Sequence, residues 1–190
     1  MNTYKRQIAT KKDFIDMYVN KASHPDYVSY FLTLTFRFDH VFFDIKHYNK
    51  MMLKIQRRIR DRICSSGNRN LYQPRMICFP EQSINLPINV ADKNFPHYHI
   101  FLLIHKNTHK KFLSKVVSVL RKEEQNTLYE FKIALFEKLN PDIFSCDLQS
   151  VYSLNHVCWY VAKNIDFLSH GSKHDDYYSF NDIYMIPKIF

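Results

Sequence analysis

Glycine is nearly absent from this chain, which has only Gly67 and Gly171 among its 190 residues. A glycine-rich phosphate loop or a dinucleotide-binding fingerprint needs several glycines at fixed spacing, so the sequence excludes both of these nucleotide-binding sites. Its four cysteines are scattered and include no Cys-x-x-Cys pair. We therefore expect reduced thiols in the core rather than a zinc site or a disulfide framework.

Long apolar runs are also missing. No stretch approaches the length of a membrane span, and the residues after Met1 lack the apolar core of a signal peptide. These features predict a protein that is not associated with a membrane and stays in the cytoplasm.

Positive charge is abundant in this chain. The formal net charge is +9, which favours polyanionic partners such as DNA or RNA. The hydrophobic fraction of 46% and the length predict one folded domain over residues 1–190, because two full domains would have little core each. We expect a core at about 28–168, a basic N-terminal arm and helix at 1–27, and a C-terminal tail at 169–190.

Hydrophobic periodicity predicts the order of helices and strands. The predicted helices are 11–22, 44–63, 108–139 and 155–167, and the predicted strands are 30–36, 74–82, 95–104 and 143–151. After the first helix, the order is strand, helix, strand, strand, helix, strand, helix. This order predicts an α+β fold, with a central antiparallel sheet of ferredoxin-like, split βαβ type and helices packed on it.

A pair of histidines begins the third predicted strand. His97 and His99 are two residues apart, so they project from the same face of a strand. Two adjacent neutral imidazoles are good ligands for a divalent metal ion. Glu81 ends the preceding strand and is the first candidate for a third ligand, with Asp39 and Asp147 as weaker alternatives. The other interpretation is a pair of ordinary surface or core histidines.

Tyr160 and Lys163 lie one turn apart on the last predicted helix. Tyrosine has a pKa near ~10 and is a poor nucleophile at neutral pH unless a nearby cation favours the phenolate. A metal-bound phosphate beside it would be a suitable electrophile. Tyr160 is therefore a candidate nucleophile, although a tyrosine on such a helix more often belongs to the core.

Three segments together resemble the HUH endonuclease superfamily, in particular its rolling-circle replication initiators (Rep proteins). Phe31–Phe36 resembles the first-strand motif, Pro96–Leu103 resembles the histidine motif, and Tyr160–Lys163 is similar to the catalytic tyrosine motif. Glu81 is similar to the acidic ligand that precedes the histidines in several groups. The resemblance spans most of the chain, roughly 31–166.

This resemblance implies sequence-specific nicking and joining of single-stranded DNA at the origin of a plasmid or DNA virus, near a hairpin. Tyr160 would form a 5′-phosphotyrosyl bond and release a 3′ hydroxyl, with Lys163 steadying the phosphate. His97, His99 and Glu81 would hold Mg²⁺ or Mn²⁺. A host helicase and polymerase would then act on the DNA, in the cytoplasm of a bacterial host or in the host cell of a virus.

The chain departs from the two-tyrosine members of this superfamily. Asn164 and His156 stand one turn from Tyr160, where a second tyrosine would lie. The enzyme would thus have a single tyrosine and would need a second protomer, a water or a free 3′ hydroxyl to complete its cycle. One alternative is therefore a single-strand transposase of the same superfamily, acting as a dimer. Another is a non-catalytic DNA- or RNA-binding module of ferredoxin-like fold.

Basic residues recur on two predicted helices. They are candidates for contact with DNA phosphates, and the other interpretation is a solvated helix face. The candidates are Lys46, Lys50, Lys54, Arg57, Arg58, Lys110 and Lys111.

Overall fold

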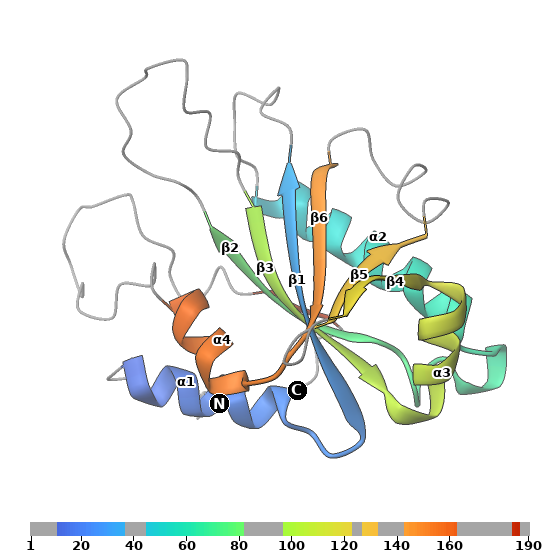
Figure 1. Cartoon of the computed structure of the whole chain (residues 1–190), viewed down its shortest axis with the longest axis horizontal. Helices are drawn as coiled ribbons and strands as arrows, with labels where there is room; N and C mark the ends of the chain where they lie inside the picture. Colours follow the sequence, from blue (N-terminus) through green and yellow to red (C-terminus); the bar gives the residue numbers. More distant parts are fainter. Residues whose placement is uncertain are drawn as a thin grey trace, which may run out of the picture.

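The computed structural model describes residues 11–36, 45–81, 97–122, 127–132, 143–162 and 184–186 (Figure 1). Its helices are α1 (Lys11–Ala22), α2 (Ile45–Ile63), α3 (Lys106–Lys115) and α4 (Leu154–Val161), with a short 3-10 helix, η1 (Ser66–Asn68). Its strands are β1 (Tyr27–Phe36), β2 (Arg75–Glu81), β3 (His97–His105), β4 (Val117–Lys122), β5 (Thr127–Phe131), β6 (Ile143–Ser150) and β7 (Tyr184–Ile186). None of the helices within these ranges is long and apolar enough to cross a membrane.

The strands of the described ranges form one seven-stranded sheet in the order β4-β5-β6-β1-β3-β2-β7. Every neighbouring pair in this sheet is antiparallel. The predicted α+β class, with an antiparallel sheet and helices packed on it, is therefore confirmed. β3 lies between β1 and β2 and is buried from Tyr98 to Ile104, as its continuous apolar sequence predicts.

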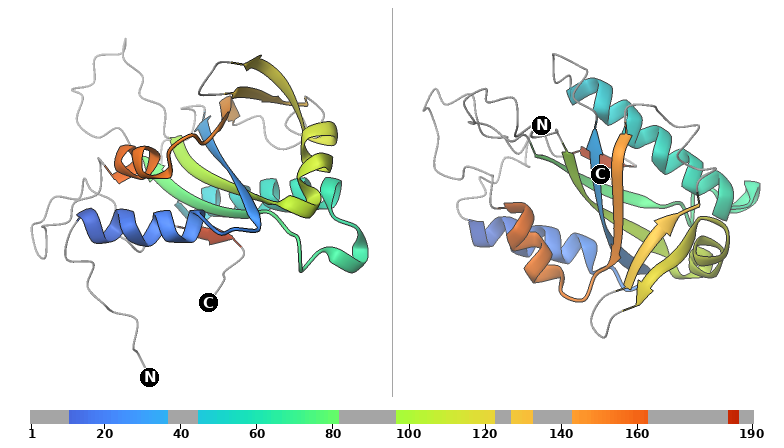
Figure 2. Two further views of the ribbon diagram at one scale, coloured as in Figure 1. Left: turned by 60° about the horizontal axis from the view of Figure 1, so that its bottom comes forward. Right: turned by 45° about the horizontal axis from the view of Figure 1, so that its top comes forward.

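Two pairs of helices cover opposite faces of the sheet. α2 and α3 pack on the face that carries Leu32 and Ile100, whereas α1 and α4 pack on the face that carries Ile77 and Phe101. Figures 1 and 2 show α1 and α4 side by side, well separated from α2 and α3. Because side chains alternate along a strand, each face of the sheet has its own hydrophobic cluster.

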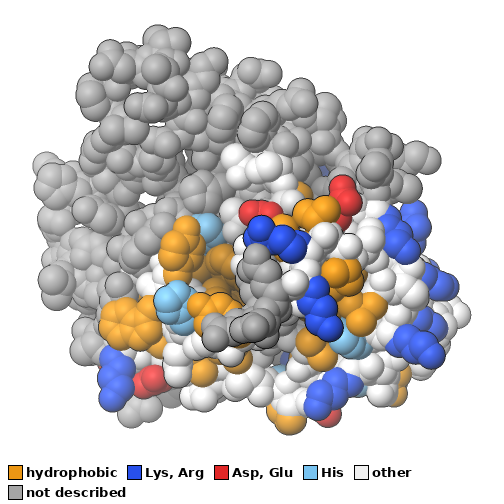
Figure 3. Space-filling view, in the orientation of Figure 1, with side chains coloured by type: hydrophobic (Ala, Val, Ile, Leu, Met, Phe, Trp, Pro, Cys, Tyr) orange, Lys and Arg blue, Asp and Glu red, His pale blue; other side chains and the backbone are white. Residues whose placement is uncertain are grey.

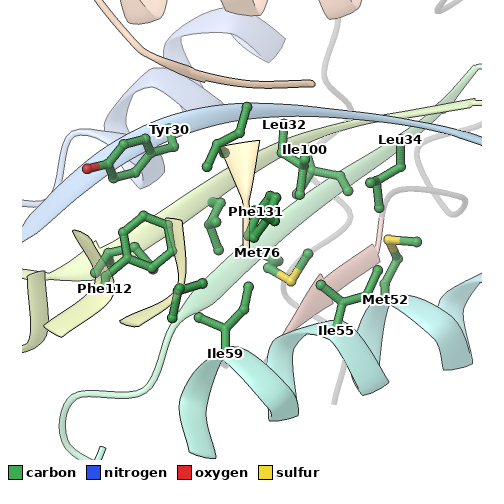
Figure 4. Close-up of a cluster of buried hydrophobic side chains, with 14 of the residues drawn as sticks. Tyr30, Leu32, Leu34, Met52, Ile55, Ile59, Met76, Ile100, Phe112 and Phe131 are labelled. Atoms are coloured by element: carbon green, nitrogen blue, oxygen red, sulfur yellow. The ribbon is translucent and has the colours of Figure 1, made fainter. Parts of the chain in front are cut away.

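The larger cluster lies beneath α2, whose apolar residues recur every three or four positions. Met52, Ile55, Ile59 and Ile63 are buried on one side of this helix, in agreement with the predicted periodicity (Figure 4). They pack in one cluster with side chains of the central strands, among them Leu32 of β1. All four cysteines lie within the described residues and are free thiols, as predicted.

Leu32 provides a direct test of this core, because it is fully buried at the centre of β1. We expect Leu32→Ala to lower the free energy of unfolding by about 3 kcal/mol, since it removes buried apolar surface and leaves a cavity. Urea unfolding measures this change. The matched control is Leu120→Ala in β4, where the leucine is 61% exposed, and we expect a change there within about 0.5 kcal/mol.

The predicted helix over 108–139 is wrong for residues 117–122 and 127–131, and its end, from residue 133, lies outside the described residues. α3 ends at Lys115, and Val117–Lys122 and Thr127–Phe131 form an antiparallel hairpin instead. The segment begins with Val116 and Val117, whose branched side chains favour a strand. Both valines and Phe131 are buried in the larger cluster. The burial of these three residues, which begin and end the hairpin, therefore outweighs the helix propensity of the charged residues that lie between them in the sequence.

A partly buried hydrogen bond links β1 to α3 on the same face of the sheet. The Tyr30 hydroxyl lies 2.6 Å from Nε2 of His109. Burial lowers the pKa of His109 and raises the pKa of Tyr30, so burial favours the neutral form of both side chains. The folded protein consequently binds a proton at His109 less readily than the unfolded chain does.

This linkage predicts an acid-sensitive stability. The free energy of unfolding should fall as the pH drops below about 6.5, the ordinary pKa of histidine, and continue to fall down to the lowered pKa of His109 in the folded state. Thermal unfolding between pH 7 and pH 5 measures the effect. His109→Gln, which has no titrating ring, should show a shallower decline, and an equally steep decline in this variant would contradict the assignment.

Candidate functional site

The predicted histidine pair lies at one end of the sheet, where β3 is flanked by β1 and β2. In the backbone register, His99 pairs with Thr33 of β1, and His97 pairs with Glu81 of β2. The prediction that β2 and β3 are neighbours, with Glu81 opposite the histidine segment, is therefore confirmed at the level of the backbone. The side chains of Glu81 and His97 lie outside the described part of the structure.

His99 is held in a defined orientation by two residues of β1. Its side chain is only 4% exposed, and its Nδ1 atom lies 3.2 Å from the Thr33 hydroxyl oxygen. The Phe31 ring stacks on the imidazole with a centroid distance of 5.4 Å and an interplanar angle of 16°. In the tautomer that donates from Nδ1 to Thr33, Nε2 carries the lone pair that a metal ligand requires.

Tyr160 of α4 reaches the same place from another part of the chain. Its ring centroid lies 5.0 Å from that of His99, at an angle of 73°. It also meets the Phe31 ring edge to face, with centroids 6.2 Å apart. Tyr160 is 43% exposed, so its ring links the buried histidine to the solvent. A phenol beside an imidazole, open to solvent on one side, is an arrangement that accommodates an incoming substrate.

The position of α4 is fixed by its buried side and its N-terminal cap. Val157, Cys158 and Val161 are buried in the smaller hydrophobic cluster, next to α1. The Ser153 side chain accepts a hydrogen bond of 3.3 Å from the backbone N–H of His156 and caps the helix. Burial raises the pKa of the Cys158 thiol to about 12, so this thiol remains protonated and serves packing.

The second residue of the predicted catalytic pair, Lys163, lies outside the described residues. α4 is described as far as Val161, with Ala162 as its C-cap, and the rest of the predicted helix, from 163 to 167, also lies outside the described residues. The structure therefore brings Tyr160 to the histidine strand but does not describe how Lys163 is oriented.

One of the three predicted metal ligands has its side chain in the described part of this site. It is His99, whose Nδ1 atom has the Thr33 hydroxyl as a partner, and in the backbone register Glu81 pairs with His97 at the adjacent strand end. Within the described residues there is no cluster of three or more metal-ligating side chains. Two of the three predicted ligands, however, have side chains outside that part. Of the weaker alternatives, Asp147 is exposed and pairs with Thr33, and Asp39 lies outside the described ranges.

The predicted phosphate contacts do not surround the pair of His99 and Tyr160. Lys50, Lys54 and Arg57 are exposed on α2, and Lys110 and Lys111 are exposed on α3. Both helices cover the opposite face of the sheet. Figure 3 shows Lys and Arg side chains on the side of the molecule where α3 lies, while hydrophobic and histidine side chains gather over α4. These basic residues therefore lie on the other face of the sheet from the contact between Tyr160 and His99.

The remaining two predicted contacts are less informative. Arg58 is half-buried on α2. The side chain of Lys46 lies outside the described part of the chain.

Sequence reasoning named Phe31 and Thr33 only as part of the first-strand motif and did not predict that they hold His99. The alternation of β1 contains the relevant signal, because residues 31 and 33 share one face of the strand while the apolar residues 30, 32 and 34 share the other. A threonine among large apolar residues on a central strand indicates a polar partner nearby. The identity of that partner depends on which strands are neighbours.

Comparisons of this chain with models of protein families, with curated proteins and with solved structures found no match. A functional conclusion therefore depends on the geometry of the site and on the motifs in the sequence.

Proposed function

We propose that this protein nicks and joins single-stranded DNA by transesterification through Tyr160, as a one-tyrosine HUH endonuclease of the replication-initiator type. The observation that carries the proposal is the contact between Tyr160 and His99, whose ring centroids are 5.0 Å apart. Two motifs that are remote in the sequence thus meet at one place. The pair combines a buried imidazole with a phenol that is open to solvent, as a metal ligand and a neighbouring nucleophile would require.

The order of the strands supports the same proposal. Four neighbouring strands of the sheet lie in the order β6-β1-β3-β2. The two inner strands, β1 and β3, are the first and third of these four along the chain. The two outer strands, β2 and β6, are the second and fourth. This interleaved order is the one that a split βαβ, ferredoxin-like arrangement produces. The histidine motif is on a central strand of that arrangement, which is a rigid support for a site.

In the proposed reaction, the Tyr160 hydroxyl oxygen attacks the scissile phosphorus. The new bond joins this oxygen to the 5′ phosphate, the bond from phosphorus to the 3′ oxygen breaks, and the phenol proton is transferred to solvent. The 3′ oxygen takes up a proton from solvent and leaves as a hydroxyl, from which a host polymerase can extend. The phosphotyrosyl bond has an energy similar to that of the phosphodiester, so reversal of the reaction joins strands without a nucleotide cofactor.

The residues around Tyr160 have distinct parts in this reaction. Thr33 and Phe31 fix the imidazole of His99, which with His97 and Glu81 is proposed to hold Mg²⁺ or Mn²⁺. Such a cation, when bound, would neutralise charge on the phosphate and make the phosphorus a better electrophile. Lys163, three residues after Tyr160 in the sequence, is proposed to steady the phosphate.

The experiment that tests the proposal is a mapping of the covalent adduct. Purified protein is incubated with single-stranded oligonucleotides covering its own replicon, with Mn²⁺ or with EDTA, and denatured. Mass spectrometry after nuclease digestion should find a nucleotide phosphate on Tyr160 in the Mn²⁺ sample only. Tight binding with no adduct on any tyrosine would reject the enzyme.

A non-catalytic single-strand-binding module is the second candidate. The exposed aromatic side chains of α4 favour it, because unpaired bases stack on such rings without any chemistry. The single-strand transposase is not distinguished from the initiator by any described residue. Both would form the same adduct, and they differ in the DNA on which they act.

A further inference from the structure

The solvent-facing side of α4 is aromatic where a surface helix usually carries charge. His156, Trp159 and Tyr160 are exposed on it, and Tyr152 is exposed just before the helix. The exposed fractions are 57% for Tyr152, 51% for Trp159 and 43% for Tyr160. α4 itself contains no Lys, Arg, Asp or Glu. Exposed aromatic residues gathered at one place usually mark a binding surface.

Three of these rings form a row along α4, because Trp159 and Tyr160 follow His156 by three and four residues, which is one helical turn. Tyr152 precedes the helix and joins the row through a ring contact. The rings of Tyr152 and His156 have centroids 6.0 Å apart and an interplanar angle of 34°. The row therefore leads along α4 to the tyrosine that contacts His99.

We propose that Tyr152, His156 and Trp159 form a stacking surface that holds the unpaired bases next to the scissile phosphate. This inference rests on the proposed function, and it assigns the part of the substrate that α4 binds. Each ring offers its face to a base, so the strand lies along α4 with its phosphate at Tyr160. Because every base has such a face, this surface selects unpaired strands rather than a particular sequence.

A nucleic-acid strand fits this surface better than a protein partner or a second copy of the chain. The protein has a formal net charge of +9, which attracts polyanions and opposes close approach of two copies. In a duplex, neighbouring base pairs cover the faces of each base, so an exposed ring can stack only on an unpaired one. The row is also continuous with the candidate nucleophile Tyr160.

The test uses the intrinsic fluorescence of Trp159, which is the only tryptophan in the chain. Tyr160→Phe protein, which cannot cut, is titrated with a mixed-sequence single-stranded oligonucleotide and with the matched duplex. We expect the single strand to quench the emission, with little change from the duplex. In the same background, Trp159→Ala should weaken single-strand binding about tenfold, as followed by fluorescence anisotropy of a labelled oligonucleotide, and Trp159→Phe should largely restore it.

The matched control is Leu71→Ala, which removes a residue that is 65% exposed outside α4 and should leave binding unchanged. Unquenched emission together with full affinity of Trp159→Ala would overturn the inference. So would quenching that depends on protein concentration without oligonucleotide, because it would show that copies of the chain cover the row. An adduct on Tyr160 without quenching refutes only the stacking surface, whereas quenching without an adduct refutes only the endonuclease.

Discussion

Replacing Tyr160 by phenylalanine is expected to abolish the covalent protein–DNA adduct while leaving binding of the strand intact. The change removes only the hydroxyl group, so the ring keeps its contacts with His99 and Phe31. Without this oxygen no bond to phosphorus can form, and the loss should be complete within the sensitivity of a denaturing gel. The folded structure should be unaffected, because the hydroxyl belongs to a side chain that is 43% exposed.

The control for this prediction is Tyr72→Phe, which removes the hydroxyl of a half-buried tyrosine outside α4. Tyr72 packs against the larger hydrophobic cluster, whereas the Phe31 ring beside His99 packs against the smaller one, so this variant should form the adduct at the rate of the unmodified protein. An adduct that persists in Tyr160→Phe would mean that another residue is the nucleophile. Equal losses in both variants would indicate that both substitutions act through the stability of the fold.

Replacing His99 by alanine is expected to reduce the rate of adduct formation about 100- to 1000-fold. The imidazole is buried, oriented by Thr33, and adjacent to the Tyr160 ring. Its loss should also weaken Mn²⁺ binding, which calorimetry can measure in a Tyr160→Phe background where no reaction occurs. A loss of both the rate and the Mn²⁺ affinity would indicate that His99 is a metal ligand. A loss of the rate alone would indicate that it only packs against Tyr160.

His109→Ala is the matched control for this variant. It removes another histidine whose ring nitrogen contacts a hydroxyl, that of Tyr30, on the opposite face of the sheet. The two substitutions should have comparable costs in stability, and only His99→Ala should lower the activity and the affinity for Mn²⁺. Equal losses of activity in both variants, in proportion to their stability, would show that His99 has a structural role alone.

Local patterns in the sequence were sufficient to predict most of the fold. The spacing of Met52, Ile55 and Ile59 defines the buried side of α2, and the apolar run after His99 defines a central strand. Both patterns are strong because each buried side chain contributes separately to the same periodicity. The alignment of Glu81 with His97 also follows, because β2 and β3 are consecutive antiparallel strands.

Features that depend on contacts between distant segments could not be predicted in this way. The hairpin of β4 and β5 was mistaken for a helix because its stability comes from burying Val117 and Phe131 against other elements. The separation of the basic helices from His99 depends on which face of the sheet each helix covers. The contact of Tyr160 with His99 likewise becomes visible only when α4 packs on the same face as α1.

The alternation of β1 ties the chemistry of this protein to its folding. Phe31 and Thr33 orient the imidazole on one face, while Tyr30, Leu32 and Leu34 belong to the larger core on the other. Inserting or deleting a single residue within this strand would exchange the two sets, placing a hydroxyl in the core and leucines beside His99. A substitution in β1 affects only the face to which its side chain points, whereas a change in the length of the strand affects both faces at once. We therefore expect functional variants of the protein to differ in the residues of β1 but to keep its length.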